Sequence, residues 1–85
     1  MTSVTDSKTR TIISNIRKLR ECKNYSQYYL AVKLGISQNA YSKIELGYTN
    51  ITLNRLIKIA EILEADLIDL INSEIEKPEK LKLAK

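Results

Sequence analysis

Two helix-start signals follow one another within Ser26–Glu45, and they constrain the fold more than any other part of the chain. Ser26 and Ser37 each stand directly before a short helix-compatible run, where a serine side chain caps the free amides of a first turn. Gly35 lies between the two runs, at the place of a left-handed helix terminator. The segment predicts two short helices joined by a tight turn: Gln27–Leu34 and Gln38–Leu46, the second stopping at Gly47.

Apolar residues around this turn have the spacing of a helix-turn-helix. Ala31 is small and allows the following helix to cross closely, while Tyr25 and Ile36 stand at hydrophobic-staple positions before the two caps. The apolar positions that would hold the helices at a steep angle are Leu30, Leu34, Ile36, Tyr41 and Ile44. The second helix of such a unit commonly enters the major groove of DNA. An αα-corner without a ligand is the alternative.

Helical periodicity also extends before and after this pair of helices. A first helix is predicted from about Thr9 to Lys23, a fourth after the cap Thr52, and a fifth after the cap Asp66. The predicted inward positions are Ile12, Ile13, Ile16 and Leu19 in the first, Leu53, Leu56, Ile57, Ala60 and Leu63 in the fourth, and Leu67, Leu70 and Ile71 in the fifth. No strand pattern alternates with these runs, so the prediction is a compact all-α domain of five helices.

The length of 85 residues allows one small domain. We expect residues 1–8 to form a disordered arm, residues 9–76 the helical domain, and residues 77–85 a charged tail, in which Pro78 ends any continuation of the fifth helix. No apolar run reaches the length of a membrane span, and the N-terminus lacks the apolar stretch of a signal peptide. A cytoplasmic protein is therefore expected.

The residue types that carry catalysis and metal binding are scarce. The chain has no His and one cysteine, Cys22, so an internal disulfide, a zinc site or a nucleophile–base pair is hard to build. We expect no enzyme, no metal and no cofactor.

The charge is distributed unevenly along the chain. Residues 8–48 hold eight basic and two acidic residues, a net charge of +6, whereas residues 49–76 hold two basic and six acidic residues, a net charge of −4. One half of the domain could face a polyanion while the other faces away, although a solvated surface with chance asymmetry gives the same pattern.

With these motifs in place, residues 16–71 resemble the phage repressor and Cro-type family of helix-turn-helix regulators, the xenobiotic-response-element type. The matching residues are Ile16–Arg20, Ser26–Gln27, Leu30–Ala31, Leu34–Gln38, Tyr41–Glu45 and Gly47, extended by Leu53, Leu56–Ala60 and Leu63. The resemblance implies a five-helix, lambda-repressor-like domain that binds double-stranded operator DNA, usually as a homodimer.

Side chains suited to base edges open the predicted recognition helix. The amides of Gln38 and Asn39 each donate and accept, so either can pair with adenine N6 and N7. Ser42 and Lys43 follow one turn later on the same side, and a lysine can reach guanine O6/N7 or a phosphate. A solvated helix face is the alternative for all four residues.

Residues around the predicted recognition helix are candidates for phosphate contacts. The resemblance implies that Gln27, at the first position of its helix, hydrogen-bonds a phosphate, where the helix amides also favour an anion. Tyr29 and Lys33 could flank the phosphates, and for Tyr29 a packing role is equally compatible. Tyr48 and Asn50 occupy places where relatives often contact the DNA backbone.

The loop after the predicted recognition helix departs from the family's pattern, whereas one charged pair matches it. Leu46 replaces the family's usual polar or basic residue and Ile51 its usual Pro, which puts phosphate contacts from this loop in doubt. The resemblance implies that Arg20 and Glu45 form a buried ion pair with a structural role.

Several apolar residues exceed what one small core needs, and they could form a dimer face around the fifth helix or simply join the core: Ile51, Ile68, Ile71, Ile75, Leu81 and Leu83.

The function predicted from the sequence is a DNA-binding transcriptional regulator of the repressor kind. An antitoxin, which would add a protein partner, a restriction-modification controller, and a protein-interaction module without DNA binding are the alternatives.

Overall fold

The computed structural model describes the backbone of residues 4–72 and the side chains of residues 7–72. Five helices make up this part of the chain: α1 (Val4–Cys22), α2 (Gln27–Leu34), α3 (Gln38–Glu45), α4 (Leu53–Leu63) and α5 (Leu67–Asn72). No strand occurs among the described residues, which confirms the predicted all-α, five-helix fold. The predicted tail, residues 77–85, lies outside the described residues.

The polar caps predicted from the sequence begin four of the helices. In each case a side-chain oxygen accepts a hydrogen bond from a backbone amide of the first turn, which satisfies a donor that has no partner within the helix. The pairs are Ser26 with Tyr29 at 2.9 Å, Ser37 with Ala40 at 3.0 Å, Thr52 with Arg55 at 3.1 Å and Asp66 with Ile68 at 3.0 Å.

The first four helices share one kind of ending. Each is followed by a residue with positive φ: Asn24 at 62°, Gly35 at 74°, Gly47 at 81° and Glu64 at 56°. The next amide then bonds back to a carbonyl five residues earlier, as from Ile36 to Ala31 and from Tyr48 to Lys43. Glu64 adopts a backbone conformation that glycine usually occupies, so its residue type did not indicate that α4 ends there.

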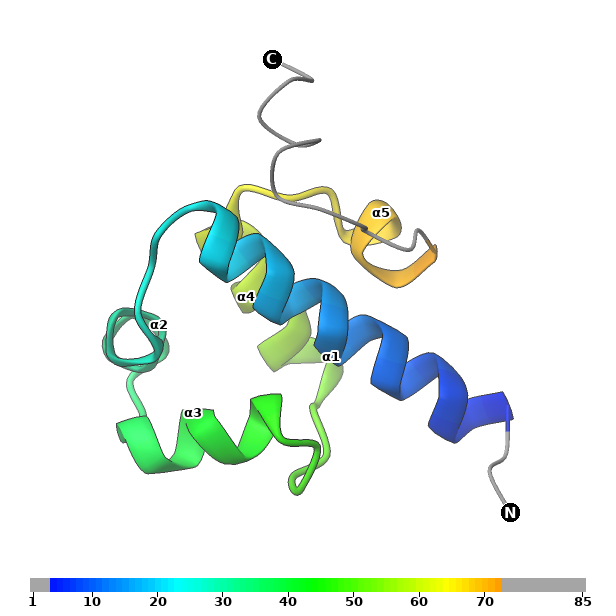
Figure 1. Cartoon of the computed structure of the whole chain (residues 1–85), viewed down its shortest axis with the longest axis horizontal. Coiled ribbons are helices and arrows are strands. Elements are labelled where there is room, and N and C mark those ends of the chain that lie inside the picture. The colour runs from blue at the N-terminus through cyan, green and yellow to red at the C-terminus, as the bar shows by residue number, and fades with distance from the viewer. Residues whose placement is uncertain (1–3, 73–85) are drawn as a thin grey trace.

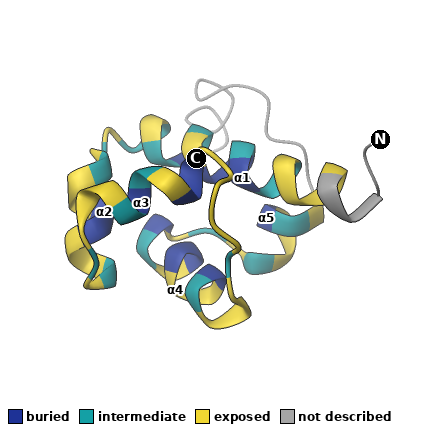
Figure 2. Ribbon diagram, turned by 90° about the horizontal axis from the view of Figure 1, so that it is seen from below, coloured by how far each residue is buried: buried dark blue, intermediate teal, exposed yellow. Residues whose placement is uncertain are grey.

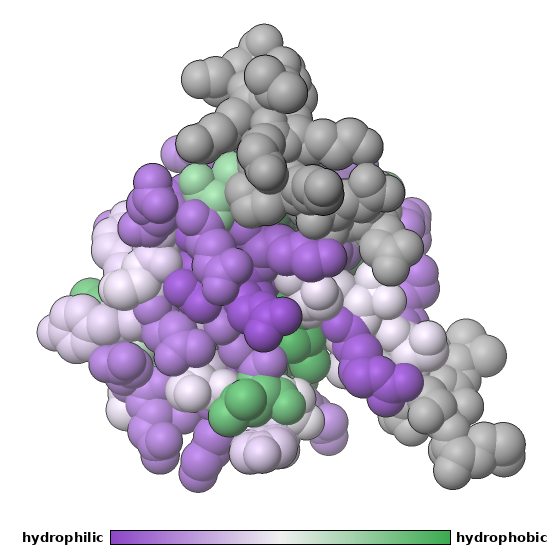
Figure 3. All heavy atoms as spheres, viewed as in Figure 1, coloured by the Kyte–Doolittle hydropathy of each residue, from purple (hydrophilic) through white to green (hydrophobic). Residues whose placement is uncertain are grey.

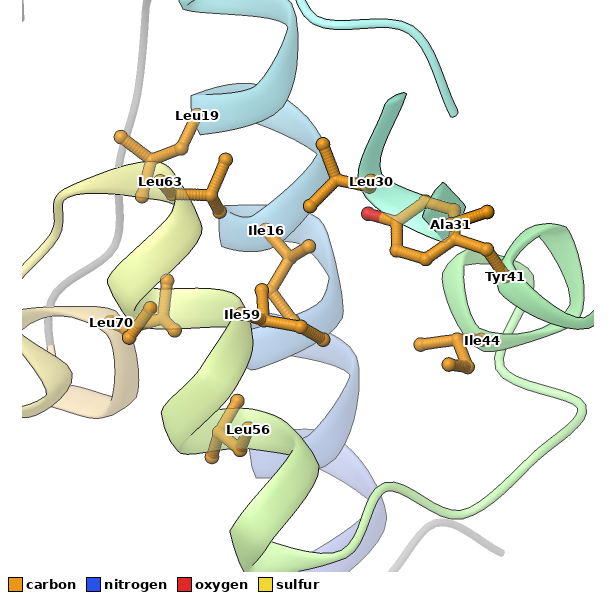
Figure 4. Close-up of a cluster of buried hydrophobic side chains, with 11 residues drawn as sticks. Ile16, Leu19, Leu30, Ala31, Tyr41, Ile44, Leu56, Ile59, Leu63 and Leu70 are labelled. Carbon is orange, nitrogen blue, oxygen red and sulfur yellow. The ribbon is translucent and has the colours of Figure 1, made fainter. Parts of the chain in front are cut away.

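The core lies where side chains of all five helices meet (Figure 4). Its buried members are Ile16, Leu19, Leu30, Ala31, Tyr41, Ile44, Leu56, Ile59, Ala60, Leu63 and Leu70. The predicted inward face of α4 was partly wrong, because Leu53 is 66% exposed and Ile57 is 37% exposed, while Ile59 is fully buried. The same helical spacing fits both stripes, and packing against α1 and α5 selects the one that includes Ile59.

The beginning of α1 differs from the prediction. The helix begins at Val4 rather than near Thr9, so residues 4–8 are helical where a disordered arm was expected. The extended part of α1 reaches α5: Lys8 Nζ donates to the carbonyl of Ile71 at 3.3 Å, near the end of α5, where cations favour a helix.

Two of the three surplus apolar residues that the structure describes, Ile51 and Ile71, pack against the core. Ile51, Leu67 and Ile71 are half-buried and pack against the core cluster, while Ile68 remains 60% exposed. Ile75, Leu81 and Leu83 lie outside the described residues. Ile51 and Ile71 therefore do not belong to a free apolar face.

The helices are arranged so that α2 and α3 lie on one side of α1 and α5 on the other (Figure 1). In this view α2 is seen end-on and α3 from the side, so the two helices cross steeply. Within residues 4–72, no helix combines the length and apolarity of a membrane span.

Candidate nucleic-acid interface

Helix α3 has two faces of opposite character. Tyr41, Ile44 and Glu45 are buried, whereas Gln38 and Asn39 are exposed. Lys43 is also exposed and Ser42 is half-buried, and both follow Asn39 at helical spacing. Figure 2, seen from the side that carries α2 and α3, shows exposed and buried residues alternating along α3. The structure thus brings the four predicted base-reading residues together on one outward face.

The buried face of α3 is held by α2. Ala31 is 1% exposed and Tyr41 is 0% exposed, and Figure 4 shows the Tyr41 ring beside Ala31 at the crossing of the two helices. A small residue at this position lets the backbones approach. This contact fixes the direction in which the outward face of α3 points.

A polar cluster around the carboxylate of Glu45 joins α1, α2 and α3. Arg20 donates to both carboxylate oxygens, from Nε at 2.7 Å and from Nη2 at 3.1 Å. Tyr41 Oη donates at 2.6 Å and Gln27 Nε2 at 3.1 Å. Arg20 Nη1 also donates to the carbonyl of Tyr25 at 2.9 Å, at the start of α2. The side chains of Arg20 and Glu45 are only 11% and 3% exposed.

The hydrogen bonds of this cluster determine its ionisation. Burial acts to raise the pKa of the Glu45 carboxyl, but the hydrogen bonds from Arg20, Tyr41 and Gln27 outweigh it and hold that pKa below its ordinary value. The bond to Glu45 raises the pKa of Arg20. Burial and the bond to Glu45 raise the pKa of Tyr41 far above that of a free phenol. The cluster is therefore an ionised pair with a neutral tyrosine.

Gln27 stands at the junction between this cluster and the surface. Its side chain is half-buried, and one amide hydrogen is committed to Glu45. A glutamine NH₂ has two donors, so the second remains available for an anion in front of α2. The sequence did not indicate this bond to Glu45.

Aromatic and basic side chains stack along the outer side of α2. The rings of Tyr25 and Tyr29 lie 4.4 Å apart between centroids, and Lys33 Nζ lies 5.5 Å from the centroid of Tyr29. Tyr29 is 36% exposed, so it combines packing with an accessible surface. Both uses considered for Tyr29 are compatible with this position.

The turn between α3 and α4 is largely exposed. Tyr48 is 77% exposed and Asn50 is also exposed, while Ile51 packs against the core. Leu46, at the end of α3, is 61% exposed. Tyr48 and Asn50 are thus accessible to a ligand that lies along the outward face of α3.

Two polar roles were missed in the sequence. Tyr41 was taken as a core residue only, yet its hydroxyl binds Glu45, and the four-residue spacing between them was the available signal. Asn15 was not singled out, yet it is fully buried and its Nδ2 donates to the carbonyl of Leu70 at 2.9 Å. Nothing in the local sequence separates Asn15 from an exposed polar residue.

Other kinds of site find little support in the described residues. No three His, Cys, Asp or Glu side chains among them are grouped to hold a metal ion. Cys22 is half-buried near the end of α1.

Comparison with known proteins finds relatives that are named as helix-turn-helix transcriptional regulators. The chain is 40% identical over 67 residues to the HTH-type transcriptional regulator SlrR of Bacillus subtilis, covering 78% of this chain and 44% of SlrR. It is 31% identical over 75 residues to the HTH-type transcriptional regulator AnsR of the same organism, covering 85% of this chain and 65% of AnsR. The chain thus spans less than two thirds of either relative.

A family match covers most of the helical domain. No solved structure matches the chain with significance. The model of the helix-turn-helix family matches residues 16–70, from the middle of α1 into α5. This range contains the Arg20–Glu45 pair and both helices of the turn. The chain therefore belongs to the helix-turn-helix family of the Cro/C1 type.

Proposed function

We propose that this protein is a sequence-specific DNA-binding transcriptional regulator whose α3 enters the major groove of operator DNA. One observation carries the proposal: α3 has an outward face of exposed polar side chains, while its other face is fixed by α2 and by the Glu45 cluster. A rigidly held helix with exposed amides suits the donor and acceptor pattern of base edges. The transcriptional regulators related to this chain support the same reading.

Base recognition and phosphate binding fall to different residues. Gln38 and Asn39 read adenine, and Lys43 with Ser42 reads guanine or the adjacent phosphate. The phosphate contacts, which set affinity and register, come from Gln27, Tyr29, Lys33, Tyr48 and Asn50. The exposure of Tyr29, Lys33, Tyr48 and Asn50 supports this assignment.

Repression follows if operator occupancy blocks transcription. A homodimer through the α5 region would present two copies of α3 to a two-fold-related site. The 60% exposed Ile68 on α5 supports this arrangement. A protein of this kind acts on DNA in the cytoplasm.

The test is selection of bound sequences from random DNA at physiological salt, followed by affinity measurements on the selected site. Asn39→Ala should lose about 1–3 kcal/mol of discrimination at one base pair. Equal weakening on all sequences would contradict base reading by Asn39. Absence of any salt-dependent DNA affinity in the wild type would favour a protein-interaction module, and co-purification of a second protein would favour an antitoxin.

A further inference from the structure

Two arginines of α1 lie beside the end of α3, in a place that the assignments above leave unused. Arg10 and Arg17 line a pocket of about 210 Å³ together with Ile13, Ser14, Leu46 and Gly47. The four α1 residues are spaced at three, four and seven positions, so they share one side of the helix. The pocket therefore joins one side of α1 to the turn that follows α3.

The floor of the pocket is closely packed. A Cβ atom placed on Gly47 would lie 3.8 Å from Cδ1 of Ile13, so the turn runs directly against α1. Gly47 has a φ of +81°, a conformation that glycine adopts without strain. These features hold the turn against α1, and the two exposed arginines line the same pocket.

Two exposed arginines give the pocket a positive charge. Arg10 and Arg17 are exposed, and neither forms an ion pair with another residue whose side chain the structure describes. The acidic residue in the lining is Glu45, and its carboxylate is already bound by Arg20. Among the residues that line the pocket, an anion would meet two guanidinium groups and no carboxylate that is free of its own partner.

The pocket continues the outward face of α3. Leu46 follows Asn39 by seven residues and Ser42 by four, so all three lie on one side of the helix. Leu46 is 61% exposed and also lines the pocket, which places Arg10 and Arg17 at the end of the proposed reading face. Figure 3, a view of this molecule across α1, shows a mainly hydrophilic surface with small hydrophobic areas.

We infer that Arg10 and Arg17 form a phosphate clamp on α1, which binds the DNA backbone at the C-terminal end of α3. This inference rests on the proposed DNA-binding function and adds an element to it. The two residues are two helical turns apart, about 10.5 Å along α1, so they reach different phosphates. Guanidinium groups bind phosphate oxygens in paired hydrogen bonds. The clamp supplies the charge that Leu46 does not bring to the turn.

The test measures the dependence of DNA affinity on salt for Arg10→Gln, Arg17→Gln and the double variant, on the selected operator and on unrelated DNA. Each single variant should lower the slope of log affinity against log salt by about 0.9, which corresponds to about fivefold weaker binding at 0.15 M salt. The loss should be equal on both DNAs, because phosphates carry no sequence information. The double variant Arg10→Lys with Arg17→Lys should keep the wild-type slope.

The control is Lys23→Gln, which removes the same charge at the other end of α1, where Lys23 pairs with Glu64 at 3.3 Å. The clamp would be overturned if the arginine variants had the same salt slope as this control. In that case the proposed function would still stand, provided that the wild type selects a specific DNA sequence. Loss of all DNA binding in the wild type would overturn both. Binding of inorganic phosphate at the pocket with unchanged DNA slopes would assign it to a free anion and also overturn the clamp.

Discussion

The two faces of α3 use the same kinds of side chain for opposite purposes. On the inner face, the carboxylate of Glu45 has four hydrogen bonds from three residues and is almost inaccessible to water. On the outer face, Gln38, Asn39 and Lys43 are exposed, and their side chains form no hydrogen bond or ion pair with the part of the chain that the structure describes. Polar groups that are fully satisfied hold an element in place, whereas polar groups left open are available to a ligand. The inner face thus orients the helix that the outer face would use.

The largest effect on stability is expected from Glu45→Ala. This change leaves the guanidinium of Arg20 buried without its partner, so the free energy of unfolding should fall by about 3–5 kcal/mol. Urea denaturation followed by circular dichroism measures the change. Lys43→Ala, on the outer face of the same helix, should stay within about 0.5 kcal/mol of the wild type. Equal losses in the two variants would contradict the distinction between the faces.

Acid should lower the free energy of unfolding by protonating the carboxylate of Glu45 on the inner face. Because the pKa of Glu45 is lowered in the folded state, its contribution is fully present above its ordinary value of 4.5 and is lost as the pH falls through the folded pKa. Stability measured from pH 7 down to pH 2 should therefore decline more in the wild type than in Glu45→Gln. Parallel curves would show that this carboxyl does not link stability to pH.

Tyr41→Phe removes one hydroxyl and preserves the ring that packs beside Ala31. The lost hydrogen bond to a charged acceptor should cost about 1.5–3 kcal/mol. The stability of the variant should also fall less than that of the wild type as the pH rises into the alkaline range. The raised pKa of Tyr41 means that its contribution is present below the ordinary value of 10.0 and is lost as the pH rises above it. A stability equal to that of the wild type would reduce Tyr41 to a packing residue.

The smallest effect on stability is expected on the outer face, from Gln38→Ala. Gln38 is exposed, so the free energy of unfolding should change by less than about 0.5 kcal/mol. Sequence selection from random DNA should nevertheless relax at one position of the site, by about 1–3 kcal/mol. A destabilised Gln38→Ala protein with unchanged base preference would reverse the roles of the two faces.

Most helix boundaries could be predicted because their causes are local. The caps at Ser26, Ser37 and Thr52 depend on hydrogen bonds that span three residues, and the endings at Gly35 and Gly47 depend on backbone conformations that glycine favours. The beginning of α1 was not predicted in this way, and the hydrogen bond closest to it, from Lys8 to the carbonyl of Ile71, joins residues far apart in the chain.

The membership of the candidate interface was only partly predictable. The spacing of Gln38, Asn39, Ser42 and Lys43 already indicated one shared face, because helical periodicity is a local property. The second role of Gln27, as a partner of Glu45, was hidden because it depends on how α2 crosses the end of α3.

The sequence by itself determined the number and order of the helices, the caps of α2 to α5 and the turn between α2 and α3, because each depends on residues within one or two turns. Only the tertiary structure decided which stripe of α4 enters the core, that Asn15 binds the carbonyl of Leu70, and that Arg10 and Arg17 stand beside Gly47. These outcomes depend on packing between segments far apart in the chain. The same residue types could satisfy local rules in several arrangements, and the shared core selects one of them.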